Sequence, residues 1–180
     1  MAAKKAATYE NHLHEEQARW FAVHTQYKRE KLVQKALAKQ GITAYLPLRK
    51  FTRHYTRKVK TVELPLISCY VFVKITKASY LKVLQTEYVL EFVKFSRNLI
   101  AIPESEMEIM RRVIGEAELI DVQPQGYQVG DQVEIIGGEL TGLKGKLVEV
   151  EGKKRMVIAL ERLGYMLYIQ VAPELLHKVA

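Results

Sequence analysis

The chain has 180 residues, a net charge of +8 and 48% hydrophobic residues. This length accommodates one large domain or two small ones, and the apolar content argues against disorder over most of the chain. The basic excess favours a polyanionic partner such as nucleic acid, although inert basic proteins share it. No apolar run is long enough to span a bilayer, the N-terminus lacks the apolar core of a secretory signal, and one cysteine excludes a disulfide framework. We therefore expect a monomeric cytoplasmic protein with no membrane association.

The N-terminal part predicts a leader, a strand and a helix. Residues 1–18 are polar, and we expect a mobile leader. Residues 19–26 alternate apolar and polar side chains and are rich in β-formers, which predicts a strand. The period then becomes helical, and Gly41 is a natural residue to follow the helix. Along one side of this helix lysines recur at spacings of three and four, a pattern that usually marks a solvated face: Lys28, Lys31, Lys35 and Lys39.

The middle of the chain predicts an α+β sandwich. Residues 42–51 indicate a second strand, in which Pro47 argues for an edge or a bulge. Residues 70–75 are strongly β-prone, and we expect them in the centre of the sheet. Short connections favour antiparallel pairing, with helices on one or both faces. The remaining predicted elements are helices at 77–85 and 103–118 and strands at 89–95 and 98–103.

A change in texture divides the chain into two domains. The first is expected at 19–115, and residues 116–126 are acidic, contain Pro124 and Gly126, and indicate a linker. From residue 127 to residue 180 short alternating segments are separated by glycines, which predicts a small β-barrel.

A basic arm precedes the apolar run around Pro65 and is the strongest compositional signal. Cations suit phosphates, and aromatic rings can stack on unpaired bases. An exposed hairpin kept soluble by its charges would look the same, so composition leaves both interpretations open. The candidate nucleic-acid-binding residues are Arg49, Lys50, Arg53, His54, Arg57, Lys58 and Lys60, with Phe51 and Tyr55 among them.

Motifs for chemistry are weak. The stretch "GGELTGLKGK" resembles a phosphate-binding loop, but Leu140 and Leu147 stand where that motif needs a glycine and a hydroxyl. Cys69 has no nucleophile motif around it, and free cysteine is a common core residue. Apart from the pair His12 and His14, the histidines show no metal-ligand spacing. We expect no catalytic residue, no metal and no cofactor.

These segments together resemble a known family. The N-terminal domain of the NusG family of transcription elongation factors is similar to "RWFAVHTQ", "KREKLVQKALAKQGITAYLP", "LPLISCYVFVKI", "VLEFVKF" and "IAIPESEME". The family's KOW motif is similar to "VGDQVEIIGGELTGLKGKLVEV". Each segment is loose by itself, but their common order is specific. The resemblance implies an antiparallel sheet flanked by helices, followed by an SH3-like KOW barrel.

The resemblance also implies a function. A patch containing Leu66, Ile67 and Tyr70 would dock on the clamp of RNA polymerase, and the basic arm would reach the DNA of the transcription bubble. Holding the clamp closed would suppress pausing or termination. The segments "AYLPLRK", "VELPLISCYVFVK", "FVKF" and "IPESEM" resemble specialised antiterminators of the RfaH and UpxY types, and the latter serve polysaccharide operons.

Two departures from the family pattern leave alternatives open. Ile67–Ser68–Cys69–Tyr70 stands where the family has Phe-Pro-Gly-Tyr, and the C-terminal end lacks the usual Gly-Arg-x-Thr-Pro run. The partner of the KOW domain is therefore open between a ribosomal protein, a termination factor and neither. Competing hypotheses are a ribosome-associated RNA-binding KOW protein and an enzyme acting on nucleic acid through Cys69 or a histidine.

Overall fold

The computed structural model describes residues 9–55, 58–95, 97–116, 130–136, 140–150, 153–160, 165–171 and 175–179. The chain divides into two units, Met1–Glu104 and Ser105–Ala180. The expected linker at 116–126 falls almost wholly outside the described residues, so the predicted domain boundaries stay predictions. None of the helices in the described part has the length and apolar character that crossing a bilayer requires.

The first unit is built on an antiparallel sheet of four strands, in the order β2 (Thr43–Tyr45), β5 (Tyr70–Ile75), β1 (Arg19–Thr25) and β6 (Val89–Phe92). Strands β5 and β1 occupy the centre and pair in register from Arg19↔Ile75 to His24↔Tyr70. The predicted central position of residues 70–75 is thereby confirmed. The prediction of a short strand at 98–103 is wrong, because Asn98, Leu99 and Ile102 make only isolated bridges.

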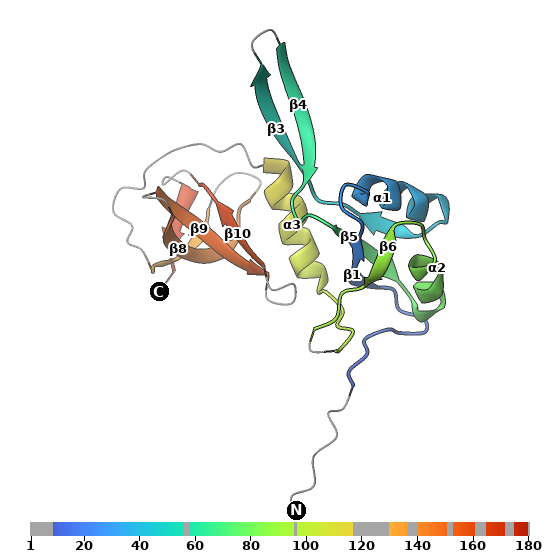
Figure 1. Ribbon diagram of the computed structural model, residues 1–180. Coiled ribbons are helices and arrows are strands. Elements are labelled where there is room, and N and C mark those ends of the chain that lie inside the picture. The colour runs from blue at the N-terminus through green and yellow to red at the C-terminus, as the bar shows by residue number, and fades with distance from the viewer. Residues whose placement is uncertain are drawn as a thin grey trace, which may run out of the picture. The chain divides into compact units, whose positions relative to one another are not determined.

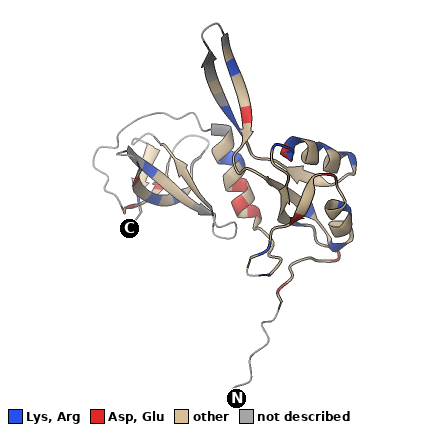
Figure 2. Ribbon diagram, viewed as in Figure 1, with Lys and Arg blue, Asp and Glu red and all other residues tan. Residues whose placement is uncertain are grey.

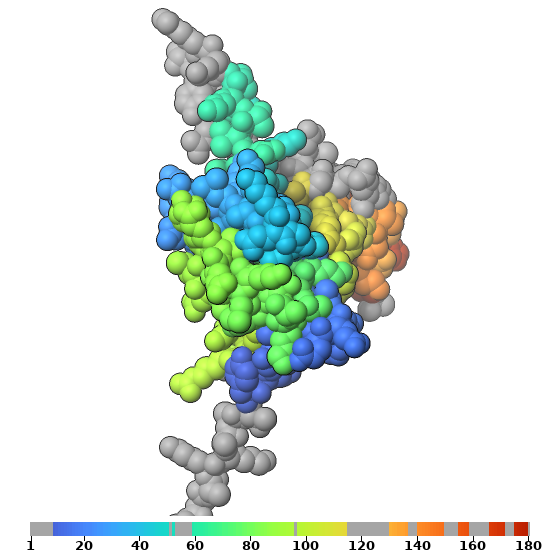
Figure 3. Space-filling model, turned by 90° about the vertical axis from the view of Figure 1, so that its right-hand side faces the viewer, coloured from blue at the N-terminus to red at the C-terminus, as the bar shows by residue number. Residues whose placement is uncertain are grey.

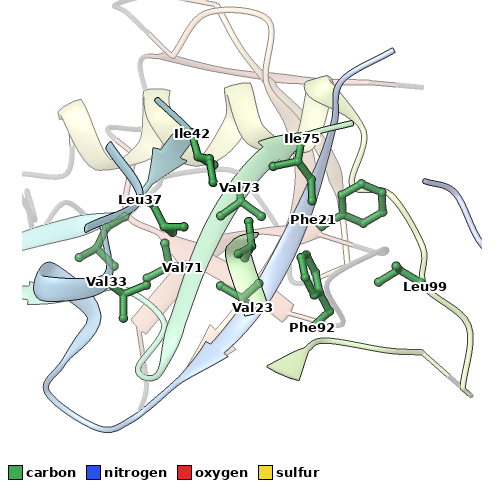
Figure 4. Close-up of a cluster of buried hydrophobic side chains, with 12 residues drawn as sticks. Phe21, Val23, Val33, Leu37, Ile42, Val71, Val73, Ile75, Phe92 and Leu99 are labelled. Atoms are coloured by element: carbon green, nitrogen blue, oxygen red, sulfur yellow. The ribbon is translucent and has the colours of Figure 1, made fainter. Parts of the chain in front are cut away.

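Helices α1 (Glu30–Lys39) and α2 (Tyr80–Leu84), the latter preceded by the 3-10 turn η1 (Lys77–Ser79), cover one face of this sheet. Val33 and Leu37 lie one helical turn apart on α1, and both enter the same hydrophobic cluster as Val83 of α2. Figure 4 shows Val33 and Leu37 beside Val71 of the central strand β5. The cluster contains Phe21, Val23, Val33, Leu37, Ile42, Leu46, Val71, Val73, Ile75, Val83, Phe92 and Leu99.

The N-terminal segment from Tyr9 onward is anchored, which corrects the expectation of a mobile leader for its described part. The amide of His12 donates to the carbonyl of Leu99 at 2.9 Å, and the amide of Leu99 donates to the carbonyl of Glu10 at 3.0 Å. The His12 Nδ1 also accepts the amide of Ala101 at 3.1 Å. Polar composition suggested mobility, but backbone pairing to a distant segment is invisible in composition.

The second unit carries a five-stranded antiparallel sheet, in the order β10 (Tyr165–Ile169), β9 (Lys153–Leu160), β8 (Lys144–Val150), β7 (Gln132–Ile135) and β11 (Leu176–Lys178). Two of its described glycines are structural: Gly142 takes a φ of 85° at the turn before β8, and a Cβ on Gly145 would lie 2.4 Å from the carbonyl oxygen of Val157. Together with the first unit, this β-rich domain confirms the predicted α+β fold class.

Helix α3 (Glu104–Glu116) spans the border between the two units. Its first residue, Glu104, accepts a hydrogen bond from the Trp20 indole at 2.8 Å and pairs with Lys74 at 3.0 Å, so the helix start is fixed to the first unit's sheet. Within the second unit, Arg112 Nη2 donates to the carbonyl of Thr141 at 2.6 Å.

Truncation tests the anchoring of the N-terminal segment. Removal of residues 1–8 should leave the free energy of unfolding unchanged, whereas removal of residues 1–14 should lower it by about 2 kcal/mol. The estimate takes several hydrogen bonds at about 1 kcal/mol each, reduced by the ordering entropy of the segment. Urea unfolding followed by the fluorescence of Trp20, the single tryptophan, measures both. Equal stability of the two truncated proteins would show that the whole leader is dispensable.

Candidate nucleic-acid and docking surfaces

The basic arm is a two-stranded antiparallel ribbon formed by β3 (Leu48–Tyr55) and β4 (Lys58–Pro65). It is inserted between β2 and β5 and stands away from the body of the first unit, as Figures 1 and 3 show. The sequence predicted one strand over residues 42–51. The structure divides it at Leu46 and Pro47, since proline has no N–H to give to a ladder.

The register distributes the arm residues over two faces. Residues directly opposite in an antiparallel pair share a face, and successive residues alternate between faces. One face, here called the basic face, holds the pairs Arg49↔Leu64, Phe51↔Val62, Arg53↔Lys60 and Tyr55↔Lys58. The other holds Leu48↔Pro65, Lys50↔Glu63, Thr52↔Thr61 and His54↔Val59. By register, the basic face thus holds the positions of most of the predicted cations and of both aromatic residues, while Arg57 lies outside the described residues.

The two faces differ in their charge balance. On the basic face the register places Arg53 opposite Lys60, a pairing of like charges that is unfavourable to the ribbon by itself. On the other face Lys50 stands opposite Glu63, whose Oε2 is also 3.5 Å from Lys31 Nζ. The basic face is therefore the side of the arm suited to phosphates, with aromatic positions suited to bases.

The lysine stripe of α1 begins beside the foot of the arm. Lys31 reaches Glu63 of β4, which joins the helix to the ribbon, and Figure 2 shows the basic residues of α1 and of the arm. Lys35 and Lys39 are exposed, as the interpretation of a solvated face requires.

Two matched substitutions on the arm test which face meets nucleic acid. Lys60→Gln should lower the slope of log affinity against log salt by about one, since one phosphate contact is lost. Lys50→Gln, an equally exposed position on the other face, should change that slope by less than half as much. Binding of labelled single-stranded and duplex DNA at several salt concentrations measures both. A slope unchanged from that of the unmodified chain in both variants would leave the arm as a solubilising hairpin.

A mismatch in length creates the loop that follows the arm. Between the pairs Tyr45↔Phe72 and Leu48↔Pro65, two residues connect β2 to β3, whereas six residues separate Pro65 of β4 from Phe72 of β5. The surplus cannot join either ladder, so it forms a loop at residues 66–69, here called the docking loop. The loop leads directly into the central strand β5.

The three residues predicted to dock on a partner lie at this loop and at the strand that follows it. Leu66 and Tyr70 are partly exposed, whereas Ile67 is only 7% exposed and belongs to the buried apolar set. The ring of Tyr70 contacts the ring of His24 edge-on, with centroids 4.7 Å apart. Leu66 is therefore the better probe of docking, because substitution of Ile67 would also disturb the core.

Three hydrogen bonds hold the docking loop. The amide of Leu66 donates to the carbonyl of Pro47 at 2.7 Å, and the amide of Thr25 donates to the carbonyl of Cys69 at 2.9 Å. The amide of Cys69 donates to Glu30 Oε1 at 2.8 Å. Cys69 has a φ of 64°, the left-handed conformation that glycine adopts most easily. The cysteine therefore takes a glycine-like conformation where the resembled family has Pro-Gly.

Substitution of Cys69 tests this conformation. Cys69→Gly should raise the free energy of unfolding by about 1 kcal/mol, because a left-handed non-glycine residue carries a steric cost of about 1–2 kcal/mol. Cys69→Val should lower it, since a β-branched side chain tolerates this region least. Chemical denaturation of the three proteins gives both values, with Ser68→Gly as the control at a position without a positive φ. A loss of stability in Cys69→Gly would contradict a strained residue 69.

Sequence reasoning missed Glu30, because a glutamate in a helix's first turn carries no signal of burial. It also missed a cluster where the loops at residues 26–29 and 86–88 meet. There Arg29 lies over the ring of Tyr88, 5.1 Å from its centroid, and Lys28 and Tyr88 are both left-handed. The hydrogen bond between Tyr88 and Glu87 raises the pKa of the tyrosine above its ordinary value.

The candidate chemical groups have structural surroundings. Cys69 is a partly exposed residue, and His24 lies 3.7 Å from Glu91 through its Nδ1. His12 and His14 accept backbone amides in the anchored N-terminal segment. Among the described residues, no three His, Cys, Asp or Glu side chains come together in a way that would hold a metal ion.

Comparison with known proteins identifies the family. Residues 18–111 match the family model "NusG: Transcription termination factor nusG", and residues 129–160 match the model of the KOW motif. Comparison with curated proteins gives no significant match. The first match spans more than half of the chain and includes the sheet and the arm of the first unit. The chain therefore belongs to the NusG family of transcription factors, and it carries a KOW motif in its second unit.

One solved structure supports the same fold. A structure titled "Domain interaction in Thermotoga maritima NusG" is similar, with a TM-score of 0.58 and 21% identity, covering 91% of this chain and 98% of that one. Two conformations of an MjSpt4:Spt5 complex also match, A with a TM-score of 0.30 and 21% identity and B with 0.32 and 20%. Both cover 89% of this chain, and 98% and 97% of their own.

Proposed function

We propose that this NusG-family chain docks on the clamp of RNA polymerase through Leu66 and its neighbours and extends the basic arm to the DNA of the transcription bubble. The observation that carries the proposal is the direct connection of the two surfaces. The docking loop closes the foot of the arm through the hydrogen bond from Leu66 to Pro47, 2.7 Å long. Attachment of the loop to a partner would therefore set the direction of the arm.

The proposed effect is on a conformational equilibrium. A protein that binds the clamp and the DNA together favours the closed clamp, since both contacts are available only in that state. The closed state elongates, so pausing or termination is suppressed. The role needs no turnover chemistry from Cys69 or from the histidines.

The specialised role rests on resemblance. The segments "AYLPLRK" and "VELPLISCYVFVK" support an antiterminator of the RfaH or UpxY type, in the latter case acting at polysaccharide operons in the cytoplasm. The partner of the KOW domain would be a ribosomal protein or a termination factor. The KOW match at residues 129–160 also favours a second candidate, a ribosome-associated RNA-binding protein.

Substitution of Leu66 tests the docking surface. Leu66→Glu should weaken binding to purified core polymerase by at least tenfold, because a charged side chain cannot be desolvated at an apolar interface. Leu32→Glu is the matched control: Leu32 is an exposed leucine on α1, 44% accessible, and should bind as the unmodified chain does. Surface-immobilised polymerase gives the affinities, and amide NMR spectra verify that both variants are folded.

Transcription with purified polymerase separates the candidate functions. On a template with pauses and a terminator, the unmodified chain should increase read-through, and Leu66→Glu should not. Binding to ribosomal subunits without any binding to polymerase would overturn the proposal in favour of the ribosomal role.

A further inference from the structure

We infer that Glu30 is a positioning residue for the docking loop, and that its carboxylate maintains the loop conformation in which Leu66 and Tyr70 are partly exposed. The inference rests on the proposed function, because it concerns the surface that would meet polymerase. Glu30 was not among the candidate residues from the sequence, and it lies on a different element from the loop.

The contacts place Glu30 beneath the loop. It is the first residue of α1 and is 4% exposed, and its Oε1 accepts the amide of Cys69 at 2.8 Å. The carbonyl of Cys69 accepts the amide of Thr25 from the end of β1 at 2.9 Å. Both backbone polar groups of the last loop residue are thus held by the β1–α1 connection.

The charge of Glu30 explains its strength as an acceptor. A carboxylate in the first turn of a helix is stabilised by the helix dipole, and its hydrogen bonds are roughly twice as strong as those of neutral acceptors. A buried carboxylate is costly unless it is hydrogen-bonded. The hydrogen bond from the Cys69 amide therefore helps to offset the cost of burying the Glu30 carboxylate at the start of α1.

The loop needs such a restraint. The loop residues lie outside both ladders, and Cys69 is left-handed. Without other contacts, a non-glycine residue populates the left-handed conformation roughly tenfold less than the right-handed one. If the bond to Glu30 is lost, the turn relaxes toward the right-handed region. Leu66 and Tyr70 then leave their positions, although α1 and the sheet keep their core.

Three variants test the role by binding to core polymerase. Glu30→Ala should raise the dissociation constant about tenfold, equivalent to 1.4 kcal/mol. Glu30→Gln keeps an oxygen acceptor and should stay within about threefold of the unmodified chain. Glu30→Ala with Cys69→Gly should recover most of the affinity, because glycine adopts the left-handed turn without help. Glu15→Ala, which removes an exposed carboxylate 2.5 Å from Lys77, is the control and should bind normally.

Amide hydrogen exchange and NMR shifts of residues 66–70 read the loop without polymerase. Exchange at the Cys69 amide should accelerate at least tenfold in Glu30→Ala and slow again in Glu30→Gln, with the amides of the β1–β5 pair unchanged. Unchanged exchange and shifts in Glu30→Ala would overturn the inference, as would normal polymerase binding by that variant. Failure of Cys69→Gly to restore binding would also overturn it, in favour of a general loss of stability. If the unmodified chain itself does not bind polymerase, the proposed function fails, and the exchange result still decides whether Glu30 holds the loop.

Discussion

The hydrogen bond from the Leu66 amide to the Pro47 carbonyl closes the foot of the arm, and both candidate surfaces depend on it. Strands β2 and β5 are antiparallel neighbours, so the arm is an excursion from one sheet edge back to its centre. The excursion returns with more residues than it leaves with, and the surplus becomes the docking loop. The single hydrogen bond between Leu66 and Pro47 therefore fixes both the base of the charged arm and the start of the docking loop.

Electrostatics and packing act on different parts of this assembly. Leu48 at the foot of the arm packs against the hydrophobic cluster, whereas Lys50 and Lys60 are exposed and remain available to a polyanion. The loop is joined to the core through Ile67 and to α1 through Glu30. The positively charged arm and the loop that is fixed to the core are thus adjacent segments of the chain. This arrangement suits a factor that acts by binding, because a bound protein shifts a conformational equilibrium only through its different affinities for the two states.

Much of the fold was readable from sequence, and the reasons are local. Alternation in residues 19–26 and the β-prone composition of residues 70–75 specified strands. The helical period that follows residue 26 specified α1, of which Val33 and Leu37 are buried while Leu32 is exposed. The family followed from the order of such segments. The strand predicted at 98–103 is absent because Asn98, Leu99 and Ile102 make isolated bridges to three different segments, at Phe95, Asn11 and Trp20, instead of one full ladder.

The sequence by itself determined the composition of the candidate surfaces: a run of cations with aromatics, then an apolar stretch that enters β5. Only the tertiary structure decided how these residues are used. Register placed Arg53 opposite Lys60 and Lys50 opposite Glu63, and register depends on pairing between strands rather than on either strand alone. Burial separated Ile67 from Leu66, and the approach of α1 brought the Glu30 carboxylate to the amide of a left-handed cysteine. Contacts of this kind join residues far apart in the chain, and local periodicity carries no record of them.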